Sequence, residues 1–450
     1  MKSPPFTPRL PTVTAILRPA VLLMGALLAT SAASGAGQKA FPTAEGFGAL
    51  ARGGRGGAVL FVTNTNDTGP GSLRAAVETP GPRTVIFRVS GTIFLKHELR
   101  IKEPFLTLAG QTAPGDGICL KGHRLQIDAP DCIIRHLRVR MGDENRVAED
   151  AIAVYTHAHN TIIDHCSASW AVDETISATN AKNVTVQWCI ISESLNKSVH
   201  PKGAHGYGSL INGEEITYHH NLYAHHSDRV PRPAACFLEF RNNVLYDLGG
   251  GGYNHGEATQ MNYVANYVIP VTAREASFSI RKLYGPQNLS RIFFADNFHA
   301  GSPEATADNR RLLRVNEGCG NAADVLTAHP FPVPAEFAVT TDAAKRAFER
   351  VLAGAGATRP SRDVVDTRVV DEVRMKKGGI INSQKDVGGY PEYRSAAAPV
   401  DADKDGMPDD WEKEHGLSPR NADDRNLDPD RDGYTNLEEF LNGTNPHKKD

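Results

Sequence analysis

The sequence predicts an all-β fold, a right-handed single-stranded parallel β-helix, over residues 37–300. A short β-rich run that ends in a small or polar residue recurs along this segment, in the copies 132–137, 161–166, 184–189, 216–221, 238–243, 262–266 and 292–297. The last residues of successive copies lie 29, 23, 32, 22, 23 and 31 positions apart. A short repeat with variable insertions is typical of a solenoid, and the Leu-x-x-Leu-x-Leu pattern of a leucine-rich repeat is absent.

The last four copies end in the same amide residue, at Asn221, Asn243, Asn266 and Asn297. Equivalent positions of stacked coils lie roughly 4.8 Å apart, so identical amide side chains can exchange hydrogen bonds. These residues therefore predict a structural ladder, and we give the neighbouring histidine pair 219–220 the same structural interpretation.

The N-terminal residues 1–36 have the pattern of a signal peptide. Basic residues precede an apolar run at 20–29, and small residues follow it. The apolar run is too short to span a bilayer comfortably. The rest of the chain contains no apolar stretch of about 18 residues. The sequence therefore predicts a secreted protein without a membrane span.

Residues 301–394 lack the strand pattern and predict a C-terminal cover for the solenoid. Segments 341–352 and 362–373 have helical spacing and capping residues. The Pro/Ala-rich segment 395–400 predicts a linker to the tail, residues 401–450.

Charge is distributed unevenly between the tail and the rest of the chain. The tail carries 15 acidic and 7 basic residues, a balance of −8, whereas the whole chain has a net charge of −3, which leaves +5 for residues 1–400. This balance is too weakly basic to indicate nucleic-acid binding. It fits an anionic substrate and a cation-binding tail.

The tail contains two twelve-residue stretches that match an EF-hand-like calcium loop. Oxygen ligands are expected at loop positions 1, 3, 5, 9 and 12 and from a backbone carbonyl at position 7, with glycine at position 6. In the first loop these ligand positions are Asp401, Asp403, Asp405, Met407, Asp409 and Glu412. In the second loop they are Asp428, Asp430, Asp432, Tyr434, Asn436 and Glu439. The tail therefore predicts structural Ca²⁺ binding at 401–450.

The segment from 216 to 246 contains the most specific motif. Arg229-Val-Pro-Arg232 lies between two of the repeated strand-like copies, 216–221 and 238–243. This arrangement resembles the pectate lyases of polysaccharide lyase family 1. The resemblance implies a calcium-dependent lyase that cleaves polygalacturonate by β-elimination, with Arg229 as the base that abstracts the C5 proton and Arg232 as a substrate-binding residue. Ala234 stands where the family often has another arginine.

The resemblance also implies a calcium site close to Arg229. Segment 149–154 is similar to the first acidic segment of the family and offers Asp150, although Ala148 replaces an expected aspartate. Asp173 and Glu174 are similar to the second acidic segment. Lys197 lies near the position of the family's substrate-binding lysine, and Lys202 is the alternative.

Two other functions remain open at this point. A pectin lyase would act on methylated substrate without calcium, and a non-catalytic carbohydrate-binding β-helix would only display the basic loop. The paired carboxylates that glycoside hydrolysis needs are not assembled in a recognisable pattern. We expect a secreted, monomeric pectate lyase that takes polygalacturonate or a related pectic polysaccharide as its partner and Ca²⁺ as its cofactor.

Overall fold

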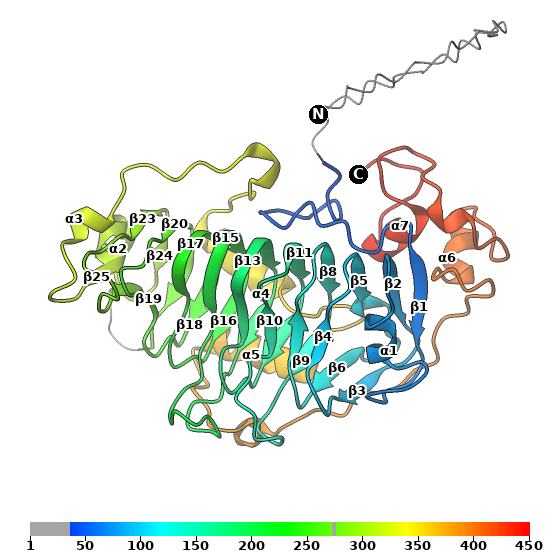
Figure 1. Cartoon of the computed structure of the whole chain (residues 1–450), viewed down its shortest axis with the longest axis horizontal. Coiled ribbons are helices and arrows are strands. Elements are labelled where there is room, and N and C mark those ends of the chain that lie inside the picture. The colour runs from blue at the N-terminus through cyan, green and yellow to red at the C-terminus, as the bar shows by residue number, and fades with distance from the viewer. Residues whose placement is uncertain (1–36, 272–275) are drawn as a thin grey trace, which may run out of the picture. The chain divides into compact units, whose positions relative to one another are not determined.

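The computed structural model describes residues 37–271 and 276–450, and Gln38–Asp450 form one compact unit. The predicted signal peptide, residues 1–36, lies outside the described residues. Short strands stack in parallel register along successive coils, so the predicted parallel β-helix is confirmed (Figure 1).

Three parallel sheets form the faces of the solenoid among the described residues. The largest runs through β1 (Ala58–Val62), β2 (Arg83–Phe87), β5 (Leu106–Ala109), β8 (Cys132–Arg135), β11 (His159–Asp164), β13 (Ile176–Gln187), β15 (Leu210–His219), β17 (Arg232–Arg241), β20 (Gln260–Val264) and β23 (Arg291–Ala295). Its side branch, which joins at β13, contains β4 (Leu99–Ile101), β7 (Leu125–Ile127) and β10 (Ile152–Val154). The second sheet contains β3 (Gly91–Phe94), β6 (Ile118–Lys121), β9 (Arg138–Arg140), β12 (Ser167–Ser169), β14 (Ile190–Ser192), β16 (Leu222–Ala224), β18 (Val244–Tyr246), β21 (Tyr267–Ile269) and β24 (Phe298–His299). The third contains β19 (Gly252–Asn254), β22 (Phe278–Ile280) and β25 (Leu313–Val315).

The predicted asparagine ladder runs along the inside of one bend. Asn221 Nδ2 donates to Asn243 Oδ1 at 3.0 Å, Asn243 Nδ2 donates to Asn266 Oδ1 at 3.2 Å, and Asn266 Nδ2 donates to Asn297 Oδ1 at 3.0 Å. Asn309 adds a rung that the repeat does not predict, since its Oδ1 accepts from Asn297 Nδ2 at 3.0 Å. The structural role of these asparagines is confirmed.

The residue that makes each bend adopts a left-handed backbone and stacks on its neighbours. His136, His165, Trp188 and His220 have φ values of 51°, 49°, 52° and 53°. Their ring centroids lie 5.1, 6.0 and 4.4 Å apart in succession. Histidine tolerates this backbone region better than most residues do, which accounts for three of these four positions.

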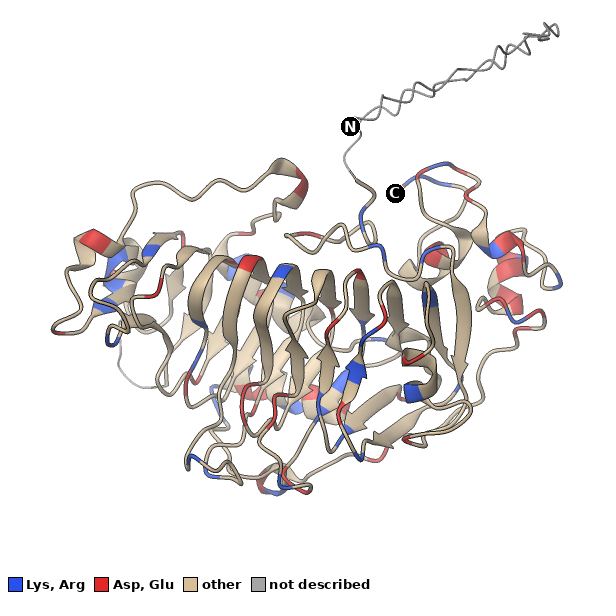
Figure 2. Cartoon of the chain, viewed as in Figure 1, with Lys and Arg blue, Asp and Glu red and all other residues tan. Residues whose placement is uncertain are grey.

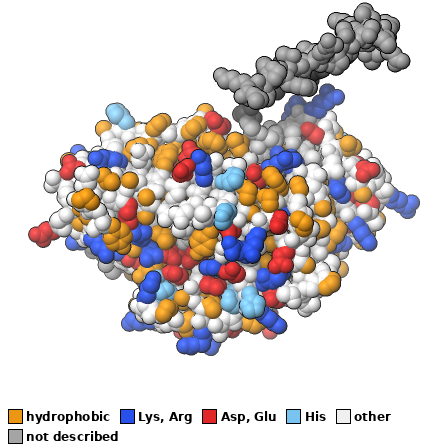
Figure 3. Space-filling view, viewed as in Figure 1, with side chains coloured by type: hydrophobic (Ala, Val, Ile, Leu, Met, Phe, Trp, Pro, Cys, Tyr) orange, Lys and Arg blue, Asp and Glu red, His pale blue; other side chains and the backbone are white. Residues whose placement is uncertain are grey.

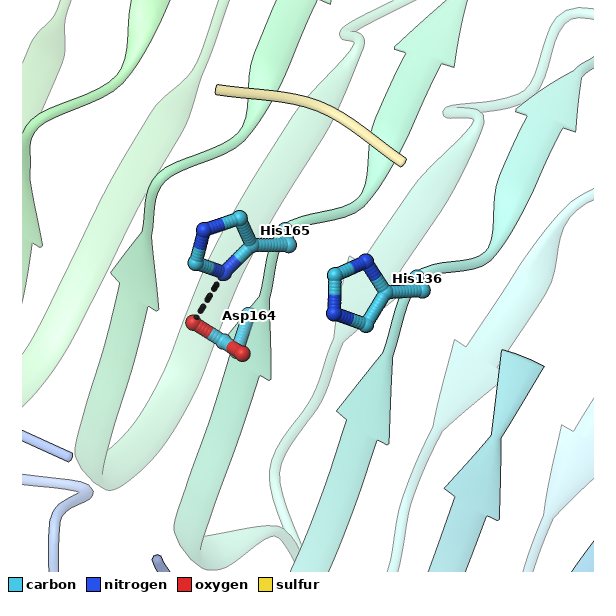
Figure 4. Close-up of side chains that lie close together, drawn as sticks. All are labelled: His136, Asp164 and His165. Atoms are coloured by element: carbon cyan, nitrogen blue, oxygen red, sulfur yellow. Dashed lines mark hydrogen bonds and ion pairs between the residues drawn. The ribbon is translucent and has the colours of Figure 1, made fainter. Parts of the chain in front are cut away.

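Two histidines of this stack, buried His136 and half-buried His165, form with buried Asp164 a group that has the composition of a metal site (Figure 4). The Asp164 carboxylate is already saturated, because it accepts hydrogen bonds from Arg135 Nε at 2.8 Å and Gln187 Nε2 at 2.7 Å and lies 2.8 Å from His165 Nδ1. Burial opposes its ionisation, but the charges of His165 and Arg135 hold the pKa of Asp164 well below its usual range. We interpret this group as a structural network.

His219 and His220 are also buried within hydrogen bonds. His219 Nε2 lies 3.1 Å from Gln187 Oε1, and His220 Nε2 lies 3.3 Å from Asp342 Oδ2. Their predicted structural role is confirmed.

Two helices pack against the second sheet at the segments where helical spacing was found. These are α4 (Ala344–Gly354) and α5 (Val364–Met375). Their buried side chains Val351, Leu352, Val369, Val370 and Val373 form one apolar cluster with Ile190, Leu222 and Val244 of the sheet. The remaining helices are short: α1 (Leu73–Val77), α2 (Pro303–Ala307), α3 (Ala322–Val325), α6 (Asp409–Glu414), α7 (Asn436–Asn442), and the 3₁₀ turns at Gly110–Thr112, Asn309–Leu312, Ala335–Phe337, Gln384–Val387 and Asp424–Asn426.

The tail packs directly on the first coils of the solenoid (Figure 1). Met407, Leu437 and Leu441 are buried against Ile86 and Ala109. Ion pairs flank this contact, because Arg55 Nε lies 2.7 Å from Glu438 Oε1 and Arg88 Nη1 lies 3.4 Å from Asp401 Oδ2. Acidic residues are conspicuous on α6 (Figure 2).

All six cysteines lie in the described part of the chain, buried and without a disulfide. Among the helices of residues 37–271 and 276–450, none has the length and apolar character that a membrane span requires.

Candidate active site

The strands β10, β13, β15 and β17 pair in succession in the largest sheet. The turns that precede them stack into one continuous ladder. We call Asp150, Glu174, Tyr207 and Asp228 the site ladder. Ala151 N donates to Glu174 O at 3.1 Å, and parallel bridges join Glu174 to Tyr207 and Tyr207 to Asp228. Because the repeat keeps these turns in register, residues 78 positions apart in the chain, 150 and 228, share one edge of the solenoid.

Three carboxylates gather at one end of this ladder. We call Asp150, Asp173 and Glu174 the site acids; one ligand oxygen from each lies within 4.8 Å of the others. Asp150 and Glu174 are only 5% and 4% exposed, and Glu174 N donates to Asp150 Oδ1 at 3.2 Å. The structure therefore brings together the three acids that the sequence suggested as cation ligands.

Asp150 and Asp173 differ in the charges that surround them, and their pKa values shift in opposite directions. Burial and the adjacent negative charge of Asp173 raise the pKa of Asp150 to about 8. Burial acts on Asp173 in the same direction, but the interactions with His205 and His200 outweigh it and bring the pKa of Asp173 below its usual value. Clustered carboxylate oxygens are the ligands that calcium prefers, and a divalent cation would supply the charge that Asp150 lacks.

Arg229 follows the last residue of the site ladder and contacts the site acids. Its backbone is left-handed, with φ 56°, and its Nη1 forms an ion pair with Glu174 Oε1. The guanidinium lies over the Tyr207 ring, 4.4 Å from its centroid, and Nε donates to the Tyr253 hydroxyl at 3.3 Å. With 20% of its side chain exposed, Arg229 is held beside the acids and stays open to solvent.

The other predicted binding residues have different surroundings. Arg232 is largely buried and donates from Nη2 to Glu257 Oε1 at 2.7 Å. Lys197 and Lys202 are exposed, on a segment anchored by its backbone: Lys197 N donates to Asn382 Oδ1 at 2.9 Å, and Lys202 N to His200 Nδ1 at 3.1 Å.

A column of stacked rings that the sequence did not predict ends on Arg229. The His200 and His205 rings stack at 3.7 Å with an interplanar angle of 5°, and the His205 and Tyr207 centroids lie 3.9 Å apart. His205 Nε2 lies 2.7 Å from Asp173 Oδ1. His200, His205 and Tyr207 stand close together in the sequence, and that spacing is the signal that could have predicted the column.

A second partner missed at the site orients the turn that carries Arg229. Arg281 contacts Asp228 with two nitrogens, at 2.5 and 2.7 Å, and stacks over Tyr253 at 3.9 Å. Acidic and basic side chains are interspersed over the face of the molecule seen in Figure 3.

The acids of the first tail loop gather in two groups that share Asp405. Ligand oxygens of Asp401, Asp403 and Asp405 lie within 4.8 Å of one another, and so do those of Asp405, Glu412 and Asp424. Burial and neighbouring carboxylates raise the pKa of Asp405 to about 7 and that of Glu412 to about 8. Asp424 was not predicted, because it lies outside the loop pattern.

Two predicted residues of the first loop make other contacts. Asp409 Oδ1 accepts a hydrogen bond from Ala402 N at 2.8 Å. The Met407 side chain is buried in the contact with the solenoid, so only its carbonyl is a potential ligand.

The second tail loop has a similar arrangement, although several of its oxygens bond to the loop backbone. Asp428 Oδ1 accepts from Arg431 N at 2.8 Å, and Asp432 Oδ1 accepts from Tyr434 N at 3.0 Å. One buried oxygen each of Asp430, Asn436 and Glu439 has no hydrogen-bond partner among the described residues. Buried carboxylate and amide oxygens without partners are costly unless a cation binds them.

No protein-family model matches the chain. It is 36% identical over 416 residues to the probable pectate lyase C of Aspergillus oryzae, an alignment that covers 90% of this chain and 94% of that protein. The corresponding Emericella nidulans protein is 35% identical over 413 residues, covering 90% and 93%.

Solved structures share the fold at low sequence identity. Pectate lyase Bsp165PelA from Bacillus sp. N165, solved in complex with trigalacturonate, has a TM-score of 0.52 and 17% identity, covering 69% of this chain and 98% of that one. Jun a 1, the major allergen from cedar pollen, has a TM-score of 0.52 and 18% identity, covering 70% and 92%. With identities of 36% and 35% over nearly the whole of its curated relatives, the chain belongs to the pectate lyase family and is a polysaccharide lyase.

Proposed function

We propose that this chain is a calcium-dependent pectate lyase that cleaves polygalacturonate by β-elimination. The observation that carries the proposal is the site ladder, which sets Arg229 beside Asp150, Asp173 and Glu174. The relatives' names as probable pectate lyases and the trigalacturonate in a structure of the same fold support the choice of substrate.

The reaction requires one base and a way to mask negative charge. The base removes the proton from C5, the C4–O bond breaks, a double bond forms between C4 and C5, and the departing sugar oxygen takes up a proton. Calcium, when bound, offsets the charge of the uronate carboxylate and so makes the C5 proton easier to remove. Asp150, Asp173 and Glu174 are the residues that would hold it.

Arg229 is the residue that we assign as the base. Arginine is normally charged, and Arg229 forms an ion pair with Glu174. If Glu174 instead serves as a cation ligand, the guanidinium loses its closest negative partner. Tyr207 and Tyr253 then hold the side chain in place. We infer that Glu174 exchanges Arg229 for the cation when the site fills.

The remaining basic residues would bind uronate carboxylates. Lys197 and Lys202 are exposed and can reach solvent-borne substrate, whereas Arg232 is largely buried beside Glu257. We assign all three to substrate binding, and Arg232 would do so from the first position of β17, three residues after Arg229.

We also propose that both tail loops bind Ca²⁺ in a structural role. Their unpartnered buried oxygens and the packing of the tail on the first coils support this role. Signal-peptide features in residues 1–36 support export, and we expect the secreted protein to act as a monomer.

Product formation from polygalacturonate, followed by the ultraviolet absorbance of the unsaturated ends, tests the proposed activity. We expect product with calcium and almost none with a chelator. Activity on methylated pectin that survives chelation would indicate a pectin lyase instead. Binding of polygalacturonate without any product would indicate a non-catalytic carbohydrate-binding protein.

A further inference from the structure

Asp424 lies between the two tail loops, at the start of the 3₁₀ turn Asp424–Asn426, and outside both twelve-residue patterns. It is only 4% exposed. Its Oδ2 accepts a hydrogen bond from Ser418 N at 3.1 Å, whereas its Oδ1 is buried without a partner among the described residues. Half of this carboxylate is therefore free for a ligand.

That free oxygen converges with others from the first loop. Both carboxylate oxygens of Asp403 and Glu412, together with Asp405 Oδ2, are buried and have no hydrogen-bond partner within residues 37–271 and 276–450. Asp405 and Glu412 are fully buried, and their ligand oxygens lie within 4.8 Å of that of Asp424. Several buried carboxylates in one place are stable only when protonated or paired with a cation.

The geometry of the first loop explains why an outside carboxylate is needed. Pro408 occupies position 8 and is the N-cap of α6. Asp409, at position 9, uses its Oδ1 to accept from Ala402 N and so to close the loop. Asp424 supplies an oxygen from the opposite segment, which raises the count toward the six to eight oxygens that calcium takes.

The same segment connects the first loop to the second. Asn436, at position 9 of the second loop, is fully buried and donates from Nδ2 to the backbone carbonyl of Asp424 at 2.8 Å. Its own Oδ1 is unpartnered within the described residues. One short turn therefore carries a carboxylate for the first loop and is held by an amide of the second.

We propose that Asp424 is a ligand of the first tail cation and that its contact with Asn436 couples the two tail sites, so that calcium binds them cooperatively. The proposal rests on the calcium-binding tail proposed above. The ligand is a hard divalent cation, because the atoms offered are oxygens of carboxylates, an amide and the backbone.

Calorimetric calcium titration of the full chain tests this proposal, in a Glu174→Gln background that weakens the site beside Arg229. Asp424→Asn should lower the affinity of one tail site about tenfold or more and reduce the cooperativity of the pair. Asp423→Asn is the matched control, since Asp423 is the adjacent acid and is exposed. Equal titrations for the two variants would overturn the ligand assignment.

Thermal unfolding distinguishes a ligand from a merely structural carboxylate. In chelator, Asp424→Asn should be at least as stable as the parent, because it removes one of several buried like charges. In excess calcium it should be less stable. A lower melting temperature in both conditions would mean that Asp424 stabilises the tail only through its hydrogen bond with Ser418.

Asn436→Ala should reduce the calcium affinity of both sites, and an effect confined to the second loop would overturn the coupling.

The parent chain separates this inference from the proposed calcium binding by the tail, on which it rests. If the parent tail binds no calcium, the proposed tail function itself fails. If it binds calcium and Asp424→Asn changes nothing, only the inference fails. Lyase activity at saturating calcium should be the same for Asp424→Asn and Asp423→Asn.

Discussion

The two acidic clusters of this chain differ in what stands next to their charge. At the site acids, Glu174 contacts Arg229, and Asp173 lies 2.7 Å from His205 Nε2. In the first tail loop, both oxygens of Asp403 and Glu412 are buried without partners among the described residues. One cluster contacts an arginine and a histidine of the chain, and the other is surrounded mainly by further acids.

Similar carboxylate groups can therefore serve different purposes in one chain. Since Glu174 already has a protein partner, the site can hold together without a cation, and filling it exchanges one partner for another. Since Asp403 and Glu412 lack such partners among the described residues, they favour the folded tail only when a cation is bound. We therefore expect calcium to control chemistry at the first cluster and stability at the second.

The largest effect should come from replacing the arginine that contacts the site acids. Arg229→Lys keeps a positive charge but shortens the side chain and removes the planar guanidinium. Loss of a catalytic base typically costs on the order of 10²–10⁴-fold in rate, and we expect a kcat about 10³-fold lower at an unchanged melting temperature. Arg232→Lys is the comparison, and it should raise KM more than it lowers kcat. Near-normal turnover by Arg229→Lys would remove the base assignment.

A third group of acids surrounds a buried histidine and extends the comparison to an internal protein cation. His225 is buried, donates from Nδ1 to Asp247 Oδ2 at 2.8 Å, and lies 3.3 Å from Glu372 Oε2 of α5. Burial opposes its charge, but these two carboxylates raise its pKa to about 9. Its unfolded value is about 6.5, so its contribution is fully present below that pH and is lost as the pH rises through about 9.

Between those two values, the folded state binds the extra proton. The free energy of unfolding should therefore fall by on the order of 3 kcal/mol across the window. Denaturant titrations at several pH values should show this fall in the parent and a flatter curve in His225→Gln. Parallel curves for both proteins would contradict the assignment.

The smallest effect should come from the ring under Arg229. Tyr207→Leu removes the stacked ring, and a cation–π contact is worth about 0.5–2 kcal/mol, which predicts a fall in kcat of up to about tenfold with little change in KM. Tyr207→Phe keeps the ring and should stay close to the parent. If Phe and Leu behave alike, the stack does not position Arg229.

The repeat pattern was sufficient to predict the solenoid and its asparagine ladder, because each copy ends at an equivalent position. The resemblance to a known family, and not the repeat, pointed to Asp150, Asp173 and Glu174, which the structure brings together. Asn309 was missed because it joins the ladder only 12 residues after Asn297, well short of a full coil.

Partners that join different segments were harder to find. Tyr207 meets Arg229 only because an insertion between two strands returns to the same edge, and the length of an insertion does not reveal its path. Asp424 was missed for a related reason, since a linear loop pattern cannot include a ligand from outside the loop. The sequence also contains no indication that Met407 packs against Ile86.

Calcium titration with two readouts on the same samples separates the two roles of calcium: formation of unsaturated product reports on the chemistry, and melting temperature reports on stability. Glu174→Gln should move the activity curve to about tenfold higher calcium and leave the melting curve in place. Asp405→Asn, which keeps the oxygen that accepts from Met407 N, should shift the melting curve and leave the activity curve in place. If both variants shift both curves alike, or if full activity persists in chelator, the division of calcium between chemistry and stability is wrong.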